Sequence, residues 1–216
     1  MHAVIINGSP RVQKNSNTDK ILKKFTKGME ESGSTFELYS LSDRKVWESA
    51  REAYYYNTDI LIALPLFVEC IPGLLLEFLE TLSPKDKGTT ISFILQSGFA
   101  EGVQLRCGEE FLKKLASELN CTYGGTLVKG NNFGIRFLKE EKLDKETGPY
   151  MEMGRVYGRR GDFLTTECRK FTGPEIYPAP LRFLLGIIFK TGARKMFLNI
   201  ADELGCSSPL DDRPFA

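Results

Sequence analysis

The sequence predicts an α/β fold in which a doubly wound, five-stranded parallel sheet is covered by helices on both faces. Short runs of apolar residues recur five times, and segments with the spacing of amphipathic helices separate them. Runs that are apolar at consecutive positions indicate strands buried on both faces, as in parallel sheets. At 216 residues, of which 42% are hydrophobic, the chain is long enough for one substantial core. We therefore expect a single domain with an extension.

The expected elements alternate between strand and helix. In chain order they are strand 3–6, helix 19–31, strand 36–39, helix 46–56, strand 60–64, a helix from Pro72 to Leu82, strand 91–95, helix 103–119 and strand 122–128. The first helix places Ile21, Phe25 and Met29 on one face, as a helix packed on a sheet requires. Pro72 suits a first helical position because its missing N–H has no partner there in any case.

The last third of the chain is expected to be helical. Residues 131–146 are charged and predict a solvated helix or lid, whereas 181–188 is a short apolar run. That run is far shorter than the roughly 20 residues of a membrane span, so we expect a helix packed on the core or on a second subunit. A further helix is expected from Lys195, and 207–216 is expected to be a tail. The predicted division is a core over residues 1–130 and a helical extension, packed on the same domain, over residues 131–216.

Charge and terminal sequence narrow the choice of partners. The 29 basic and 28 acidic residues leave a net charge of +1, which gives no electrostatic reason to expect nucleic acid or membrane as a partner. The apolar run near the N-terminus is too short for a signal peptide and ends at once in a turn. We expect a cytoplasmic protein.

Few side chains in this sequence are suited to catalysis or metal binding. The five cysteines are widely spaced and include no C-x-x-C pair, so we expect reduced thiols and no metal site. The single histidine, His2, lies at the start of the first expected strand, which disfavours a Ser-His-Asp or Cys-His site. We predict no catalytic side chain, and a cofactor would then carry the difficult chemistry.

The segment after the first strand has the features of a phosphate-binding loop. Gly8 lets the backbone approach a ligand, and Ser9 and Thr18 offer hydroxyl groups. Ser16 can cap a helix whose free N–H groups favour an anion. The alternative is an ordinary turn that leads into a well-capped helix.

The same stretch, INGSPRVQKNSNT, resembles the first loop of the flavodoxin-like NAD(P)H-dependent FMN reductases, which reads G-S-P-R and then S-N-T or a close variant. In that family the loop holds the FMN phosphate. The resemblance assigns this contact to Ser9, Arg11, Ser16, Asn17 and Thr18. The insertion of residues 12–15 makes the loop longer than in many members.

Two further loops are expected at the same edge, because a flavodoxin-type strand order of 2-1-3-4-5 places a ligand at the carboxyl ends of strands one, three and four. The second loop consists of Pro65, Leu66, Phe67 and Val68, and the third consists of Gln96, Ser97, Gly98 and Phe99. We expect Leu66 and Phe67 to be exposed and to pack on a flavin ring or in a dimer interface. The third loop resembles one that hydrogen-bonds the flavin in a subgroup of the family, although a plain strand-to-helix turn is the alternative.

The resemblance implies an FMN-dependent oxidoreductase. It would pass a hydride from NADPH or NADH through flavin N5 to a small-molecule electron acceptor such as a quinone, a flavin, a nitro compound or an azo compound. A homodimer is expected. Two alternatives stay open: a flavodoxin-type electron carrier, which the neutral net charge disfavours because carriers dock through acidic surfaces, and a non-enzymatic interaction protein.

Overall fold

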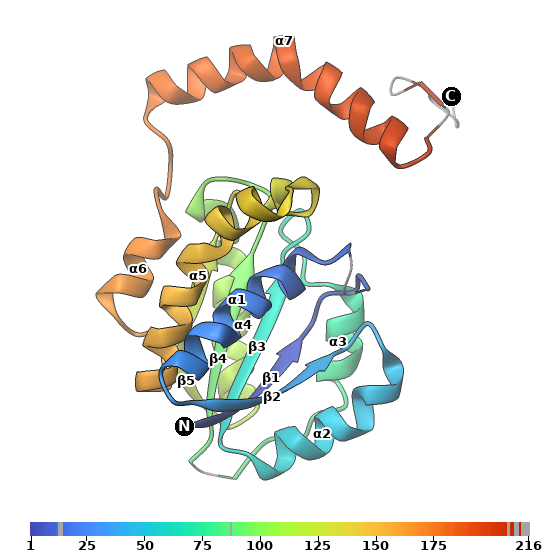
Figure 1. Ribbon diagram of the computed structural model, residues 1–216. Coiled ribbons are helices and arrows are strands. Elements are labelled where there is room, and N and C mark those ends of the chain that lie inside the picture. The colour runs from blue at the N-terminus through green and yellow to red at the C-terminus, as the bar shows by residue number, and fades with distance from the viewer. Residues whose placement is uncertain (13–14, 87, 207, 210–211, 213–216) are drawn as a thin grey trace. The chain divides into compact units, whose positions relative to one another are not determined.

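The computed structural model describes residues 1–12, 15–86, 88–206, 208–209 and 212 (Figure 1). The chain forms two compact units, Met1–Glu175 and Ile176–Ala216. Residues 13–14 of the first loop and most of the expected tail lie outside the described residues. The predicted division into a core over residues 1–130 and an extension over residues 131–216 stays a prediction.

The first unit is built on the predicted five-stranded parallel sheet, with the strand order β2-β1-β3-β4-β5. The strands are β1 (His2–Asn7), β2 (Thr35–Ser40), β3 (Asp59–Pro65), β4 (Thr90–Gln96) and β5 (Thr122–Lys129). The three central strands are buried along almost their whole length, which explains their consecutive apolar residues, while the edge strand β2 is largely exposed. The fold class is confirmed.

Helices cover both faces of the sheet (Figure 1). The elements of the first unit are α1 (Asn17–Glu31), η2 (Arg44–Val46), α2 (Trp47–Tyr56), α3 (Gly73–Leu79), η3 (Gly102–Leu105), α4 (Arg106–Glu118), η4 (Phe133–Phe137), α5 (Glu140–Arg160) and α6 (Thr166–Thr172). Because strand side chains alternate between faces, Ile5 packs with Phe25 of α1 and Tyr157 of α5. Ile6 packs on the opposite face, with residues of α2, α3 and α4.

Several helices differ from their sequence predictions. The helix expected over 103–119 begins at Arg106, after η3. Pro72 is the N-cap of α3, which begins at Gly73 and ends at Leu79 rather than Leu82. The charged segment 131–146 contains η4 and the exposed first turns of α5, but α5 continues to Arg160 and packs on α1. The sequence did not predict the buried part of α5, from Thr147 to Gly158, because glycines and one proline interrupt its apolar pattern.

The contact between α1 and α5 depends on glycine in each helix. A Cβ added at Gly154 would lie 1.9 Å from the carbonyl oxygen of Phe25, and one added at Gly28 would lie 1.9 Å from that of Met151. The two backbones therefore approach more closely than any side chain permits. This close approach brings Tyr157 within 5.8 Å of the Phe25 ring, measured between centroids.

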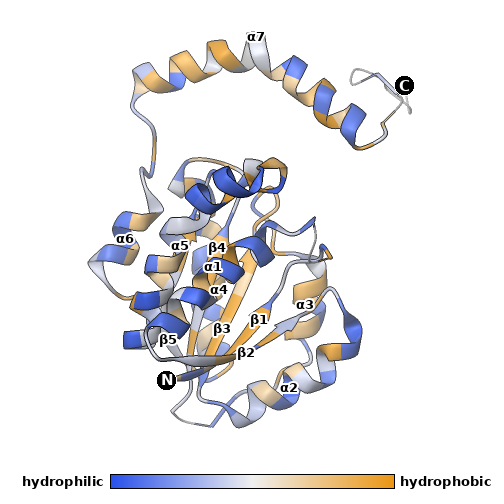
Figure 2. Cartoon of the chain, viewed as in Figure 1, coloured by the Kyte–Doolittle hydropathy of each residue, from blue (hydrophilic) through white to orange (hydrophobic). Residues whose placement is uncertain are grey.

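The second unit contains one long helix, α7 (Ala179–Glu203), where the sequence predicted two. Apolar residues dominate its first half, and charged residues are more frequent in its second half (Figure 2). Its exposed large apolar residues are Leu181, Phe183, Leu184, Ile187, Ile188, Met196, Phe197 and Leu198. Within the described residues, no helix combines the length and apolar content needed to span a membrane.

The glycine contact yields a test of the α1–α5 packing. Replacing Gly154→Ala forces the two backbones apart, and we expect the free energy of unfolding to fall by about 3 kcal/mol. Gly148→Ala in the same helix is the matched control, because a Cβ there meets no atom within 4 Å, and it is expected to gain up to about 1 kcal/mol. Urea denaturation measures both changes. Equal stability of the two variants would contradict the packing.

Candidate functional site

The three loops predicted from the sequence lie at one edge of the sheet. Asn7 pairs with Ala63 in the neighbouring strand, and Pro65 pairs with Gln96, so β1, β3 and β4 end close together. The side-chain amide of Gln96 donates to the hydroxyl oxygen of Thr18 over 3.3 Å, which joins the third loop to the first. The structure thus brings the candidate residues of the first and third loops into contact.

The first loop is closed by two buried serines. The Ser16 hydroxyl donates to the Ser9 hydroxyl over 3.0 Å and accepts from the backbone N–H of Asp19, which confirms Ser16 as the N-cap of α1. The Ser9 hydroxyl also accepts from the backbone N–H of Arg11 over 3.4 Å. Because Ser9 accepts in both of these contacts, its own hydroxyl proton can be donated to a ligand.

Gly8 has a packing role in addition to any role toward a ligand. A Cβ added at Gly8 would lie 2.7 Å from a methyl carbon of Leu75, and the Gly8 N–H donates to the carbonyl of Ala63 over 2.8 Å. The glycine expected from the sequence to admit a ligand therefore lets α3 pack against β1.

The second loop differs from expectation at one residue. Leu66 is only 4% exposed and belongs to the core, so the expectation that it is exposed was wrong. Leu66 continues the direction of β3 beyond Pro65, and its backbone N–H donates to the carbonyl of Gln96. Phe67 is 41% exposed, as expected, and the guanidinium carbon of Arg11 lies 5.9 Å from the centre of its ring. This contact joins the first and second loops.

A tight hairpin follows in the second loop. Phe67 and Cys70 exchange two backbone hydrogen bonds of 3.0 Å, and the two residues between them have positive φ angles, 48° at Val68 and 65° at Glu69. A β-branched residue rarely adopts this conformation, so the hairpin stores strain. The hairpin presents the side chain of Val68 at the surface beside Phe67.

The third loop is packed against a segment that the sequence did not assign to the site. Ser97 is buried, and its hydroxyl accepts from the N–H of Phe99 over 3.0 Å. A Cβ added at Gly98 would lie 3.2 Å from the Cβ of Phe133 in η4. Gly98 therefore allows η4 to approach the loop.

Asn132 connects the elements around this edge. Its backbone N–H donates to the carbonyl of Ser97 over 2.9 Å, and its carbonyl accepts from the side-chain amide of Asn17 over 2.7 Å. Its own amide nitrogen lies 3.0 Å from the carbonyl oxygen of Lys129 and 2.9 Å from the hydroxyl of Tyr150 in α5. Burial raises the pKa of Tyr150, so its hydroxyl stays protonated at neutral pH. The sequence contained a signal for this role, the polar pair Asn131 and Asn132, which follows the last strand after a single glycine.

The adjoining η4 carries aromatic and basic residues. The guanidinium carbon of Arg136 lies 4.4 Å from the ring centre of Phe137 and 5.5 Å from that of Phe133. Lys20 of α1 donates to the backbone carbonyl of Arg136 over 3.2 Å. Neither basic residue was predicted to belong to the site. Arg136 lies in a segment that resembles the reductase family less than the three loops do, and Lys20 lies in α1, beyond the residues that the resemblance assigned.

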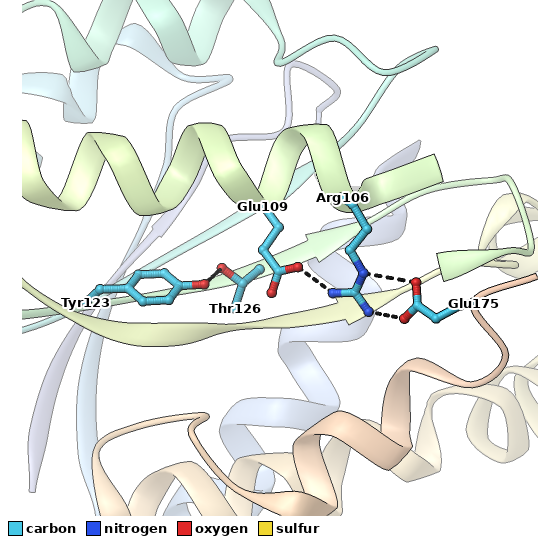
Figure 3. A network of polar contacts seen from close by, with 5 residues as sticks. All are labelled: Arg106, Glu109, Tyr123, Thr126 and Glu175. Carbon is cyan, nitrogen blue, oxygen red and sulfur yellow. Dashed lines mark hydrogen bonds and ion pairs between the residues drawn. The ribbon is translucent and has the colours of Figure 1, made fainter. Parts of the chain in front are cut away.

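A polar network lies at the start of α4, beyond the third loop (Figure 3). Arg106, the first residue of α4, pairs with both Glu109 and Glu175. The backbone N–H groups of Gly102 and Val103 also donate to carbonyls of the 174–175 segment, over 3.0 and 3.1 Å. The pairing with Arg106 lowers the pKa of Glu175. The end of the first unit is thereby attached to the segment that follows the third loop.

The fold is shared with several solved reductase structures at low sequence identity. An azoreductase from Bacillus anthracis has a TM-score of 0.54 and 10% identity over 74% of this chain and 99% of that one. A flavone reductase has a TM-score of 0.53 and 15% identity, over 74% of this chain and 63% of that one. An NAD(P)H:quinone oxidoreductase from Methanothermobacter marburgensis has a TM-score of 0.52 and 15% identity, over 74% and 98%.

No family model matches the chain, and no curated protein matches it. At 10–15% identity the structural likeness establishes the fold, which is flavodoxin-like as the sequence predicted. The residues of the three loops are positioned together, but their contact with a flavin stays a prediction.

The contact between Asn132 and Tyr150 can be measured by a double-mutant cycle. Asn132→Ala leaves the buried hydroxyl of Tyr150 without this partner, and we expect a loss of about 2 kcal/mol in the free energy of unfolding. In a Tyr150→Phe background the hydroxyl is gone, so the same change is expected to cost about 1 kcal/mol less. Urea denaturation of the four proteins gives the coupling. Strictly additive effects would show that the two side chains do not interact.

Proposed function

We propose that this chain is an FMN-dependent oxidoreductase that passes a hydride from NADPH or NADH to a small-molecule electron acceptor. The observation that carries the proposal is the contact between the three loops at the carboxyl edge of the sheet. Thr18 is bonded to Gln96, and Arg11 lies over Phe67. In an open sheet with this strand order, that edge is where ligands bind.

The residues of the first loop fit a phosphate with an attached sugar alcohol. Ser9 can donate a hydroxyl proton, and Arg11 supplies a positive charge. The N–H groups at the start of α1 favour an anion. The side-chain oxygen of Asn17 is buried and has no hydrogen-bond partner among the described residues, so it can accept from a ribityl hydroxyl. A buried acceptor of this kind is costly unless a ligand satisfies it.

The other two loops would hold the flavin ring. Phe67, Val68 and Phe99 offer exposed apolar surface, and Ser97 offers polar atoms for the ring edge. Pro65 and Leu66 would contribute through the backbone, because the side chain of Leu66 is in the core. FMN supplies N5 as the hydride acceptor. The task of the chain is then to position the two rings and exclude water, which requires no ionisable side chain.

Two other functions remain candidates for this fold. A flavodoxin-type electron carrier would bind FMN but exchange electrons with a protein partner, and such carriers dock through acidic surfaces that a net charge of +1 does not suggest. A non-enzymatic interaction protein would not bind flavin at all. The solved structures with this fold that are named above are reductases, which supports the oxidoreductase.

Anaerobic mixing with a nicotinamide tests the reductase directly. Flavin-loaded protein is expected to bleach rapidly with NADPH or NADH, and His2→Ala is expected to change the rate by no more than a few-fold. Stopped-flow absorbance measures the rate, with free FMN as the background. Ser9→Asp would place a carboxylate where the FMN phosphate is proposed to bind, so we expect this variant to lose the flavin. Bleaching over many minutes at millimolar nicotinamide would favour the electron carrier instead.

We also propose that the chain forms a homodimer through its exposed apolar surfaces, including α7, where Phe183 is 73% exposed. Light scattering is expected to give twice the 24.3 kDa of the chain. Phe183→Glu should raise the dimer dissociation constant about tenfold or more, because it places a charge in the interface. Tyr56→Glu, at a tyrosine of α2 that is 80% exposed, is the matched control. A wild-type monomer at micromolar concentration would refute the proposal.

A further inference from the structure

Three basic side chains gather beside the first loop, and two of them were not among the predicted site residues. Arg11 belongs to the loop, Lys20 to α1 and Arg136 to η4. Lys20 and Arg136 are 116 positions apart in the chain, and the bond from the Lys20 ammonium to the Arg136 carbonyl places the two segments side by side. A second hydrogen bond, from the side chain of Asn17 to the carbonyl of Asn132, also joins the start of α1 to the start of η4.

None of these three cations has an acidic partner within the described residues. No carboxylate lies within ion-pair distance of any of them, whereas Arg44, Arg106 and Arg155 all pair with glutamates. The guanidinium groups of Arg11 and Arg136 lie over aromatic rings instead. Burial and the neighbouring positive charge both lower the pKa of Lys20 and of Arg136. Like charges held together in this way favour the binding of an anion.

Arg136 also has an unused donor. Its Nε is buried and has no hydrogen-bond partner among the described residues. The two phenylalanines beside it hold the guanidinium group, so little side-chain freedom is lost when a ligand binds. A planar guanidinium with free donors suits the two-point recognition of a phosphate.

The local charge favours a dianion. The three cations and the carboxylate of Asp19, the residue before Lys20 in the chain, sum to two formal positive charges. A phosphate monoester carries between about −1.5 and −2 at neutral pH. A diester or a carboxylate carries only one negative charge and would leave the site partly unneutralised.

We propose that Lys20 and Arg136 complete, with Arg11, an anion site that takes a phosphate monoester. The identification of this phosphate monoester as the phosphate group of FMN rests on the function proposed above. In this site η4, a segment beyond the flavodoxin-like loops, acts together with α1 and the first loop to select a phosphorylated flavin over an unphosphorylated one.

Flavin titrations test this selection. Lys20→Gln and Arg136→Gln are each expected to weaken FMN binding about tenfold, which is typical of one charge-assisted hydrogen bond, and to leave riboflavin binding unchanged. Arg136→Lys should recover part of the loss because it restores the charge. Lys27→Gln removes a positive charge from an exposed position farther along the same helix, so it is the matched control and should bind FMN like the wild type.

The outcomes separate this proposal from the proposed function. Equal FMN affinity of the wild type, Lys20→Gln and Arg136→Gln would overturn it, as would an equal loss of riboflavin binding. If the wild type binds neither flavin, a titration with inorganic phosphate, followed by amide NMR, tests whether the anion site exists. Phosphate binding that Arg136→Gln weakens about tenfold would support the anion site while the flavin function fails, and no phosphate binding would overturn the site as well. Should Arg136→Gln not fold, Lys20→Gln alone gives the same comparison.

Discussion

The candidate site depends on the hydrogen bonds of one buried residue, Asn132. Its backbone bonds to Ser97 in the third loop and to Asn17 at the start of α1, and its side chain reaches Tyr150 in α5. A buried amide that lacked these partners would cost free energy, so the three elements are held in one arrangement. The loops that would contact a ligand are thereby joined to the helix layer that covers the sheet.

This arrangement links the packing of the molecule to its proposed chemistry. The glycine contacts between α1 and α5 fix the helix that carries Ser16, Thr18 and Lys20. Because α5 also supplies Tyr150, one helix pair supports both the first loop and the segment that follows β5. Hydride transfer needs two rings held in near contact, and a rigid edge of this kind would provide such positioning without an acid or base.

Much of the fold could be predicted because buried parallel strands are apolar at consecutive positions, as in β3 and β4. The N-cap at Ser16 was also predictable, since the cap and the helix that it caps, which begins at Asn17, are adjacent in sequence. The burial of Leu66 was not, because an apolar residue after a strand fits a core or a surface equally well. Arg136 was missed because its partner Lys20 lies 116 positions away, and one of the partners of Asn132, Asn17, lies 115 positions away. Such contacts follow from the tertiary fold rather than from a local pattern.

A crystal structure of the protein with FMN would show whether the joined edge of β1, β3 and β4 is the flavin site. Density for the phosphate is expected within hydrogen-bonding distance of Ser9, and density for the ring is expected beside Phe67 and Ser97. Asn17 should then donate to Asn132 as before, while its side-chain oxygen gains the ribityl chain as a partner. Flavin density elsewhere on the chain, or none at saturating FMN, would show that this edge is not a flavin site.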